Sequence, residues 1–299
     1  MKLGYFPGCA MHASGREYGE SLKAVAAPLG IELAEIDDWS CCGASAAHMT
    51  NHLLSVGLAA RNLSLAEVQG LAKVVAPCSA CFGRLAAARL ELGKDASLAK
   101  RIRPMLDRPF ENAVDVLNIL TVLRGALGRI KEKVTRPLTG LKVACYYGCL
   151  LVRPPEVAQS AQSDDPEAPT SMEQVVAATG ATCVEWNRKL DCCGAGLTMA
   201  RTGSVVRLGR AILADAKAHG AQAVVVACGM CHSNLDMRQK AMESRGETFG
   251  MPILYITELI GLSLQTTPKA LGLNRHFVDV DALVQLTSAP TLPSAPPKV

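Results

Sequence analysis

The residues of this chain that are best suited to chemistry are its cysteines. Ten of the twelve cysteines fall into two ordered copies of one pattern, which is a lone Cys, then Cys-Cys-Gly, then Cys-x-x-Cys. The first copy consists of Cys9, Cys41, Cys42, Cys78 and Cys81, and the second of Cys149, Cys192, Cys193, Cys228 and Cys231. Five thiolates exceed the four that a tetrahedral zinc ion or a cubane 4Fe–4S cluster takes. Adjacent cysteines leave the backbone in different directions, so they suit different irons of one larger cluster. The pattern therefore predicts two iron–sulfur centres of uncommon shape.

A glycine follows each cysteine pair, at Gly43 and Gly194. Glycine tolerates positive φ and lets the backbone pass close to inorganic sulfide without a clashing Cβ. Backbone N–H groups at such a position can hydrogen-bond the sulfides and tune the potential of a cluster. We therefore expect both glycines to lie against the predicted centres.

Composition narrows the class of protein. The 299 residues are enough for one large or two medium domains, and apolar residues make up 49% with only 4% aromatic, which predicts cores of Ala, Val and Leu. A net charge of +4 is small and indicates neither nucleic-acid nor membrane binding. The start of the chain does not resemble a signal peptide, and no apolar run reaches the roughly 18 residues of a spanning helix. We expect a cytoplasmic protein, in which clustered cysteines bind metal or do redox work rather than form disulfides.

The two halves of the chain repeat one plan. The segment before Cys9 is similar to the segment before Cys149, and both Cys-x-x-Cys motifs follow a run of valines. This order predicts a tandem duplication, with a first domain over residues 1–136 and a second over 137–286. The proline-rich end, residues 287–299, is expected to be disordered.

Short apolar runs between turn residues predict four strands in each half. The predicted strands are Leu3–Phe6, Ile31–Ile36, Lys73–Ala76 and Val114–Leu117, then Lys142–Tyr146, Ala181–Val184, Ala223–Ala227 and Ile253–Tyr255. A helix between two of them is indicated by Leu54, Leu58, Leu65 and Val68, at the spacing of one helix face. The alternation predicts an α/β fold of two small, mostly parallel sheets flanked by helices, with the cysteines at the carboxyl ends of strands.

The repeated cysteine pattern resembles the cysteine-rich CCG domain found in the B subunit of heterodisulfide reductase and in its relatives. Tyr147–Pro154 is similar to the segment that opens the second half of that subunit, and Asp165-Pro166 with Pro169–Met172 resembles its inserted loop. The resemblance implies two CCG domains related by a pseudo-two-fold axis, each with a non-cubane 4Fe–4S cluster. It implies Cys9, Cys41, Cys42, Cys78 and Cys81 as ligands of one cluster, and Cys149, Cys192, Cys193, Cys228 and Cys231 as ligands of the other.

The resemblance also implies an activity and partners. A disulfide is cleaved or formed between the two clusters, which face a shared cavity. One partner is an iron–sulfur protein with two cubane clusters, like the C subunit of heterodisulfide reductase. The other is a flavin-containing protein like the A subunit of that enzyme, since this chain has no GxGxxG or Walker motif of its own. The substrate is the mixed disulfide of coenzyme M and coenzyme B, or a sulfur species as in the related proteins of sulfur-oxidising bacteria. CCG proteins of fumarate reduction are disfavoured in their fused form, because the chain lacks a CxxCxxCxxxCP run.

Other interpretations remain open on the residues alone. Four thiolates in one half could hold zinc, which would make the chain a non-catalytic electron-transfer subunit with one iron–sulfur cluster. Cys145 and Cys183 have no counterpart in the first half and are predicted to be packed thiols. His12 and His232 closely follow predicted ligand cysteines in the sequence. Each is predicted either to donate a proton to a leaving thiolate or to pack around the site. His48 and His52 are expected to be a surface pair, and Trp39 and Trp186 either shield the centres or belong to the core.

Overall fold

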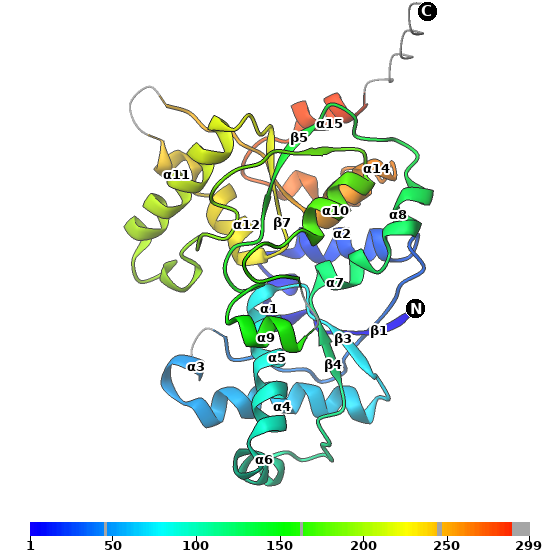
Figure 1. Ribbon diagram of the computed structural model, residues 1–299, viewed down its shortest axis with the longest axis vertical. Helices are drawn as coiled ribbons and strands as arrows, with labels where there is room; N and C mark the ends of the chain where they lie inside the picture. The colour runs from blue at the N-terminus through cyan, green and yellow to red at the C-terminus, as the bar shows by residue number, and fades with distance from the viewer. Residues whose placement is uncertain (45–46, 162–163, 244–246, 289–299) are drawn as a thin grey trace, which may run out of the picture.

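The computed structural model describes residues 1–44, 47–161, 164–243 and 247–288. Two lobes are visible in Figure 1, each built on a four-stranded parallel sheet. In the first lobe the order is β2-β1-β3-β4, with β1 Lys2–Tyr5, β2 Glu32–Glu35, β3 Lys73–Val75 and β4 Asp115–Leu117. In the second it is β6-β5-β7-β8, with β5 Lys142–Tyr146, β6 Thr182–Cys183, β7 Ala223–Val226 and β8 Ile253–Tyr255. The α/β fold of two similar sheets is confirmed, and all eight predicted strands are present.

Every described pair of neighbouring strands is parallel, so the chain must return from the carboxyl end of one strand to the amino end of the next, and it does so through helices. The helices of the first lobe are α1 Gly8–His12, α2 Arg16–Ala26, α3 Ala47–Thr50, α4 His52–Val68, α5 Ser79–Lys94, α6 Ala96–Ile102, α7 Ile119–Arg124 and α8 Leu127–Lys133, with the 3₁₀ turn η1 Arg103–Met105. Those of the second half of the sequence are α9 Pro155–Ser160, which packs on α5 of the first lobe, α10 Ser171–Ala178, α11 Thr202–Ala218, α12 Gly229–Asp236, α13 Gln239–Met242, α14 Ile256–Ser263 and α15 Asp281–Ser288, with η2 Ala195–Leu197 and η3 Leu273–Arg275. Within the described ranges, none of these helices has the length and apolar character needed to cross a bilayer.

Helix α4 forms where it was predicted, but its buried face differs in part from the predicted one. Leu65 is in the core, whereas Leu54 and Val68 are exposed at 46% and 56%. The buried residues of the helix include Val56, Ala59, Ala60, Leu63 and Ala66. Small alanines let α4 approach α5 closely, which leucines at those positions would prevent.

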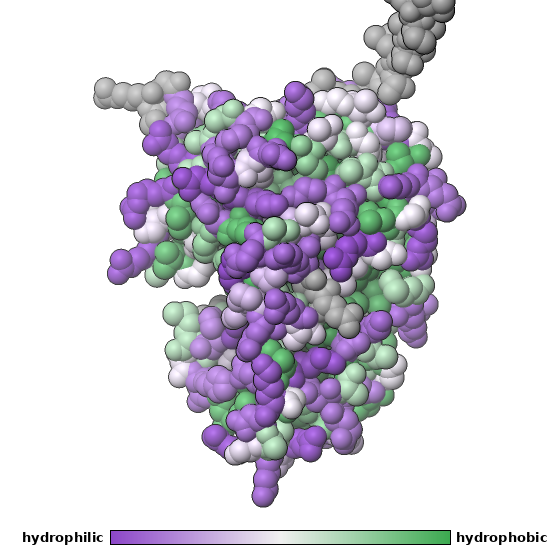
Figure 2. Space-filling view, in the orientation of Figure 1, coloured by the Kyte–Doolittle hydropathy of each residue, from purple (hydrophilic) through white to green (hydrophobic). Residues whose placement is uncertain are grey.

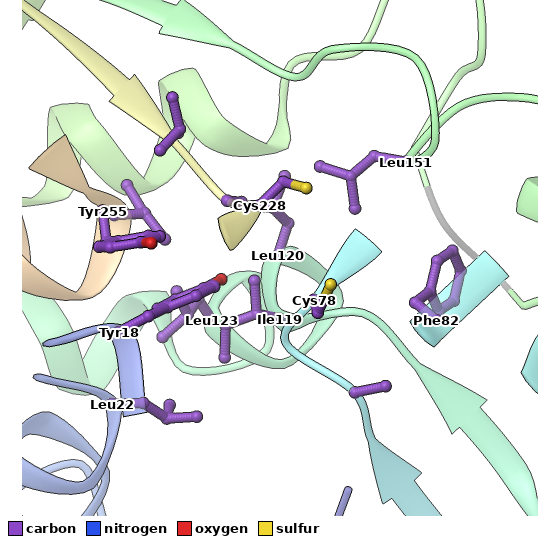
Figure 3. Packing of buried hydrophobic residues seen from close by; sticks show 14 of the residues in the cluster. Tyr18, Leu22, Cys78, Phe82, Ile119, Leu120, Leu123, Leu151, Cys228 and Tyr255 are labelled. Atoms are coloured by element: carbon purple, nitrogen blue, oxygen red, sulfur yellow. The ribbon is translucent and has the colours of Figure 1, made fainter. Parts of the chain in front are cut away.

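The two lobes pack through reciprocal pairs of helices. Helix α2 of the first lobe packs against α14 of the second, and α10 of the second packs against α7 of the first. Because α2 and α10 hold matching places in the two lobes, as do α7 and α14, these contacts are related as a pseudo-two-fold axis requires. Tyr18 on α2 stacks on Tyr255, which ends β8, with ring centroids 4.1 Å apart (Figure 3). One hydrophobic core therefore runs through both lobes.

The connection between the lobes lies between α8 and β5. The backbone N–H groups of Thr135 and Arg136 both donate to the carbonyl of Ser263, which fixes this connection against the second lobe. The predicted boundary between residues 136 and 137 falls within it. At the other end of the chain, α15 extends through Thr287 and Ser288, so these two residues of the predicted tail are helical. The rest of that tail, residues 289–299, lies outside the described residues.

Candidate metal centres

The cysteines of each pattern follow the carboxyl ends of three neighbouring parallel strands. Cys9 follows β1, Cys41 and Cys42 follow β2, and Cys78 follows β3. Cys149, Cys192 with Cys193, and Cys228 follow β5, β6 and β7 in the same way. Because parallel strands end at one edge of the sheet, three separate chain segments deliver thiols to one place in each lobe.

The structure brings the first quintet together (Cys9, Cys41, Cys42, Cys78 and Cys81). The Sγ atoms of Cys42 and Cys81 are 3.3 Å apart, and the thiol of Cys78 lies close enough to that of Cys81 for each to shift the other's pKa. Cys9 lies close enough to Cys41 and Cys42 for their charges to act on its thiol. Cys9 and Cys41 are exposed, whereas the other three are buried. The quintet is therefore open to solvent on one side only.

The second quintet (Cys149, Cys192, Cys193, Cys228 and Cys231) is gathered in the same way. The Sγ atoms of Cys193 and Cys231 are 3.5 Å apart. The thiols of Cys149 and Cys192 lie close enough to shift each other's pKa, and so do those of Cys228 and Cys231. Here too the first cysteine of the adjacent pair is exposed and the second buried. The two quintets thus have matching geometry as well as matching sequence.

The two quintets also touch each other. The thiols of Cys78 and Cys228, one from each lobe, lie close enough for each to shift the pKa of the other, and the Ser79 hydroxyl donates to the carbonyl of Ala227 at 3.2 Å. Figure 3 shows both cysteines at the lobe junction, beside the stacked Tyr18 and Tyr255. Chemistry that needs both quintets at once can therefore take place at this junction.

Four glycines shape the quintets. Gly43 and Gly194 have φ of 78° and 79°, which confirms the predicted conformation, and their N–H groups donate to the sulfurs of Cys41 and Cys192. Gly8 and Gly148, at φ of 60° and 63°, play a role that was not predicted from the sequence. A Cβ on Gly8 would lie 2.7 Å from the Cys81 sulfur, and one on Gly148 would lie 3.0 Å from the Cys231 sulfur. Only glycine lets the last cysteine of each pattern close over the first.

Interactions among the thiols shift their acidities. The hydrogen bond between Cys42 and Cys81 lowers the pKa of Cys42 to about 7, and the interaction with the Cys149 thiol lowers the pKa of Cys192 to about 6. Arg84 adds a smaller lowering effect on Cys42. In contrast, the interaction with the Cys228 thiol raises the pKa of Cys78 to about 12. Each adjacent pair therefore offers one thiolate near neutral pH, and the thiolate is the form that binds metal.

The donor set fits an iron–sulfur group. Each quintet consists of five sulfurs, and one of the five accepts a backbone N–H group, Cys41 in the first quintet and Cys192 in the second. Thiolate donors favour iron–sulfur clusters or zinc. A tetrahedral zinc ion would leave one thiol of each quintet without a role.

The other sequence-predicted residues lie outside the quintets. The sulfurs of Cys145 and Cys183 are 3.5 Å apart, and Cys183 also contacts the Glu173 carbonyl. His12 stacks on Trp39 and pairs with Glu35. The Trp186 N–H donates to the carbonyl of Cys145. These contacts agree with packing roles.

His48 and His52 are both exposed, as expected of surface residues. They lie on different helices, α3 and α4, and His52 pairs with Glu91 at 2.7 Å. His232 is 4% exposed, next to Cys231, and stacks on Tyr255.

Comparisons with known proteins agree with this geometry. The family model described as "CCG: Cysteine-rich domain" matches residues 3–86 and 143–236, which contain both quintets. The chain belongs to the CCG cysteine-rich domain family. Each CCG match covers the first three strands of one lobe and all five cysteines of its quintet.

Two relatives match this CCG protein nearly from end to end. It is 35% identical over 286 residues to the "8-methylmenaquinol:fumarate reductase membrane anchor subunit" of Wolinella succinogenes, covering 94% of this chain and 99% of that one. It is 31% identical over 288 residues to the B subunit of the ferredoxin:CoB-CoM heterodisulfide reductase of Methanosarcina mazei, covering 93% of this chain and 94% of that one. Both relatives are named as subunits of reductase complexes. The CCG protein is thus similar to iron–sulfur redox subunits, and the resemblance to the B subunit of heterodisulfide reductase is confirmed.

A solved structure shares the fold. A hypothetical protein from Helicobacter pylori superposes with a TM-score of 0.72 at 11% identity, covering 93% of this chain and 52% of that one. The similarity shows the double α/β architecture alone.

Proposed function

We propose that this CCG protein is the disulfide-handling subunit of a heterodisulfide-reductase-type complex. Each quintet would hold a non-cubane 4Fe–4S cluster, with Cys9, Cys41, Cys42, Cys78 and Cys81 as one ligand set and Cys149, Cys192, Cys193, Cys228 and Cys231 as the other. The observation that carries the proposal is that the two quintets meet at Cys78 and Cys228, whose neighbours Ser79 and Ala227 are hydrogen-bonded across the lobes. Cleavage of a disulfide releases two sulfurs that were bonded to each other and takes up two electrons. Two clusters side by side could each supply one electron and bind one of the sulfurs.

The clusters, when bound, would each supply one of the two electrons that a disulfide takes up as it becomes two thiols. The chain itself provides access and positioning. Cys41 and Cys192, the exposed members of the two pairs, lie on segments that lead into α3 and toward α11. Figure 2 shows the surface hollowed between the lobe that carries α3 and the lobe that carries α11. A substrate entering there would meet both quintets from their open sides.

The electrons must come from other proteins. The sequence carries no nucleotide motif, and relatives of this chain are named as parts of complexes. We propose, as the direct electron partner, a protein with two cubane clusters that is like the C subunit of heterodisulfide reductase. A flavin-containing protein like the A subunit of that enzyme would in turn exchange electrons with this two-cluster partner. We place the complex in the cytoplasm, and membership of the sulfur-oxidising branch stays a prediction.

A metal count with a thiol response tests the proposal. The full chain, purified without oxygen, should contain about eight irons. After oxidation it should show a paramagnetic signal that changes when substrate thiols are added. About four irons with one zinc bound by sulfur, and no thiol response, would instead support the non-catalytic electron-transfer subunit with zinc in one half.

A second candidate function rests on the Wolinella relative. Its name assigns it to a quinol-dependent fumarate reductase, and the present chain covers 99% of it. The absence of a fused ferredoxin motif therefore does not argue against this setting. Under this candidate the same two quintets pass electrons from a quinol to a fumarate-reducing partner. Cluster reduction by a water-soluble menaquinol analogue, without any response to thiols, would favour it over disulfide chemistry.

A further inference from the structure

Three buried side chains outside the quintets converge near the lobe junction. His232, Asp236 and His276 each offer one ligand atom, and these atoms lie within 4.8 Å of one another. His232 and Asp236 are four residues apart on α12, and such residues share one face of a helix. His276 arrives from the end of η3. The side chains of His232 and His276 are only 4% and 1% exposed.

Two ring nitrogens in this cluster have no hydrogen-bond partner. They are Nε2 of His232 and Nδ1 of His276, both buried among the described residues. A buried polar atom without a partner is costly and rare, so each one requires an explanation. The two rings meet edge to face, at 82° with centroids 4.7 Å apart. Both orphan nitrogens therefore belong to neighbouring rings of one cluster.

The opposite side of each ring is held by a polar neighbour. Nε2 of His276 lies 3.0 Å from Oε1 of Glu258. The His232 ring hydrogen-bonds the backbone of Ile253, and its Nδ1 is 4.0 Å from Oε1 of Glu17. Histidines that bind metals are held in this manner, with one nitrogen fixed by a carboxylate or a carbonyl and the other left for the ion.

Asp236 has a structural role that does not account for the orphan nitrogens. Its two carboxylate oxygens accept the N–H groups of Phe277 and Val278, at 2.7 and 3.1 Å. These bonds fasten the segment after His276 to α12. Each oxygen keeps a further lone pair for another ligand. These two hydrogen bonds of Asp236 do not involve Nε2 of His232 or Nδ1 of His276, which stay without a partner.

Charge also favours a cation here. Glu17, Asp236 and Glu258 are 6%, 2% and 0% exposed, so three carboxylates surround the two histidines within the core. Buried carboxylates need compensating positive charge, and a bound divalent ion is often the largest local charge in a protein site.

We propose that His232, Asp236 and His276 bind a divalent transition-metal ion, with zinc as the ion that best matches two imidazoles and a carboxylate. This site contains no thiol and is separate from both quintets. The ion would tie α12, which carries Cys231, to the segment that follows η3. The proposal does not depend on disulfide chemistry.

The test is the zinc content and zinc coordination of the full chain, purified without oxygen and without chelators. We expect about one zinc per chain, with nitrogen and oxygen but no sulfur neighbours in X-ray absorption. His276→Gln should lower the zinc content at least about fivefold and leave the iron content unchanged, since losing one ligand weakens zinc binding strongly. His219→Gln, at an exposed histidine beside Asp215, should retain all the zinc.

Zinc with sulfur neighbours, or no zinc at all, would overturn the proposal. Sulfur-bound zinc with half the expected iron would count against the two-cluster function as well, whereas a full iron content without zinc would count against this site alone. If His276→Gln does not fold, the wild-type protein can be stripped with a chelator and titrated with Co²⁺. Weak visible bands without sulfur charge transfer, and a higher unfolding midpoint on adding Zn²⁺, support the site. If neither the visible bands nor the higher unfolding midpoint appears, the proposed site is contradicted.

Discussion

Cys78 and Cys228 act on the pKa of each other's thiol, although they come from different lobes and are 150 residues apart in sequence. Each is the first cysteine of a Cys-x-x-Cys motif, so matching positions of the duplicated plan meet at the pseudo-two-fold axis. The pKa of Cys228 is lowered most by Cys231 and next by Cys78. The two quintets are therefore coupled through this pair.

This coupling predicts different effects for two cysteines of the first quintet. Cys41→Ala should remove iron from the first lobe only. Cys41 is exposed, and it belongs to the Cys-Cys-Gly motif rather than to the Cys-x-x-Cys motif that supplies Cys78 at the lobe junction. Cys78→Ala should remove that iron and also slow cluster insertion into the second lobe, because Cys228 loses a neighbour that helps Cys231 to lower its pKa and so favours its thiolate. Iron content after reconstitution, followed over time, separates the two variants.

Cys145→Ala is the matched control for both variants. It removes a buried thiol that contacts Cys183 rather than a quintet, so its iron content should equal that of the wild type. Equal iron loss in Cys41→Ala and Cys78→Ala would show that the lobes load independently.

Gly8 and Gly148 should tolerate no side chain. Gly8→Ala and Gly148→Ala place a Cβ against the sulfurs of Cys81 and Cys231, and alanine at positive φ costs on the order of 1 kcal/mol by itself. We expect both variants to lose iron from the altered lobe and to unfold at lower denaturant concentration. Iron analysis and urea unfolding measure the two effects.

Two other glycines isolate the effect of the sulfur contact. Gly70 and Gly220 also have positive φ, 69° and 78°, but nothing lies within 4 Å of a Cβ added there. Gly70→Ala and Gly220→Ala should therefore show the backbone cost without iron loss. If they lose as much iron as the variants at Gly8 and Gly148, the sulfur contact is not the cause.

Much of this architecture is predictable from the sequence because its signals are local. The strands are short β-branched runs, as in Ala223–Val226, and the cysteine spacing reports where thiols leave strand ends. The need for glycine at Gly43 follows from its place beside a cysteine pair. These inferences use residues that are neighbours in the chain.

The features that escaped prediction depend on distant segments. The requirement for Gly8 is visible only once Cys81 is known to lie against it. The buried face of α4 is decided by its close approach to α5, which the leucine spacing does not report. The cluster of His232 and His276 joins α12 to a segment beyond η3, and no spacing rule connects them. All three features are determined by tertiary contacts between segments that are far apart in the sequence.

The stack of Tyr18 on Tyr255 should hold the lobes together. Both rings are fully buried, and stacked aromatic pairs contribute beyond their area burial. Tyr18→Leu should lower the free energy of unfolding by on the order of 3 kcal/mol, since it loses the ring and leaves a cavity. Tyr18→Phe keeps the stack and loses only a long hydrogen bond to the Pro77 carbonyl, so its cost should be about 1 kcal/mol or less. Similar costs in urea unfolding for both variants would mean that the stack contributes little.

Cys9 and Cys192 should differ in reactivity in the metal-free protein although both are exposed. The interaction with the Cys149 thiol lowers the pKa of Cys192 to about 6, whereas partial burial and then the charges of Cys41 and Cys42 raise the pKa of Cys9. Because the thiolate is the reactive form, iodoacetamide at pH 7 should modify Cys192 first, and its rate should fall as the pH drops below about 6. Cys9 should react appreciably only at alkaline pH. Mass spectrometry of tryptic peptides measures both rates, and loading the protein with iron and sulfide should protect Cys192. Equal rates at pH 7, or a Cys192 that stays reactive after loading, would contradict the arrangement of thiols described above.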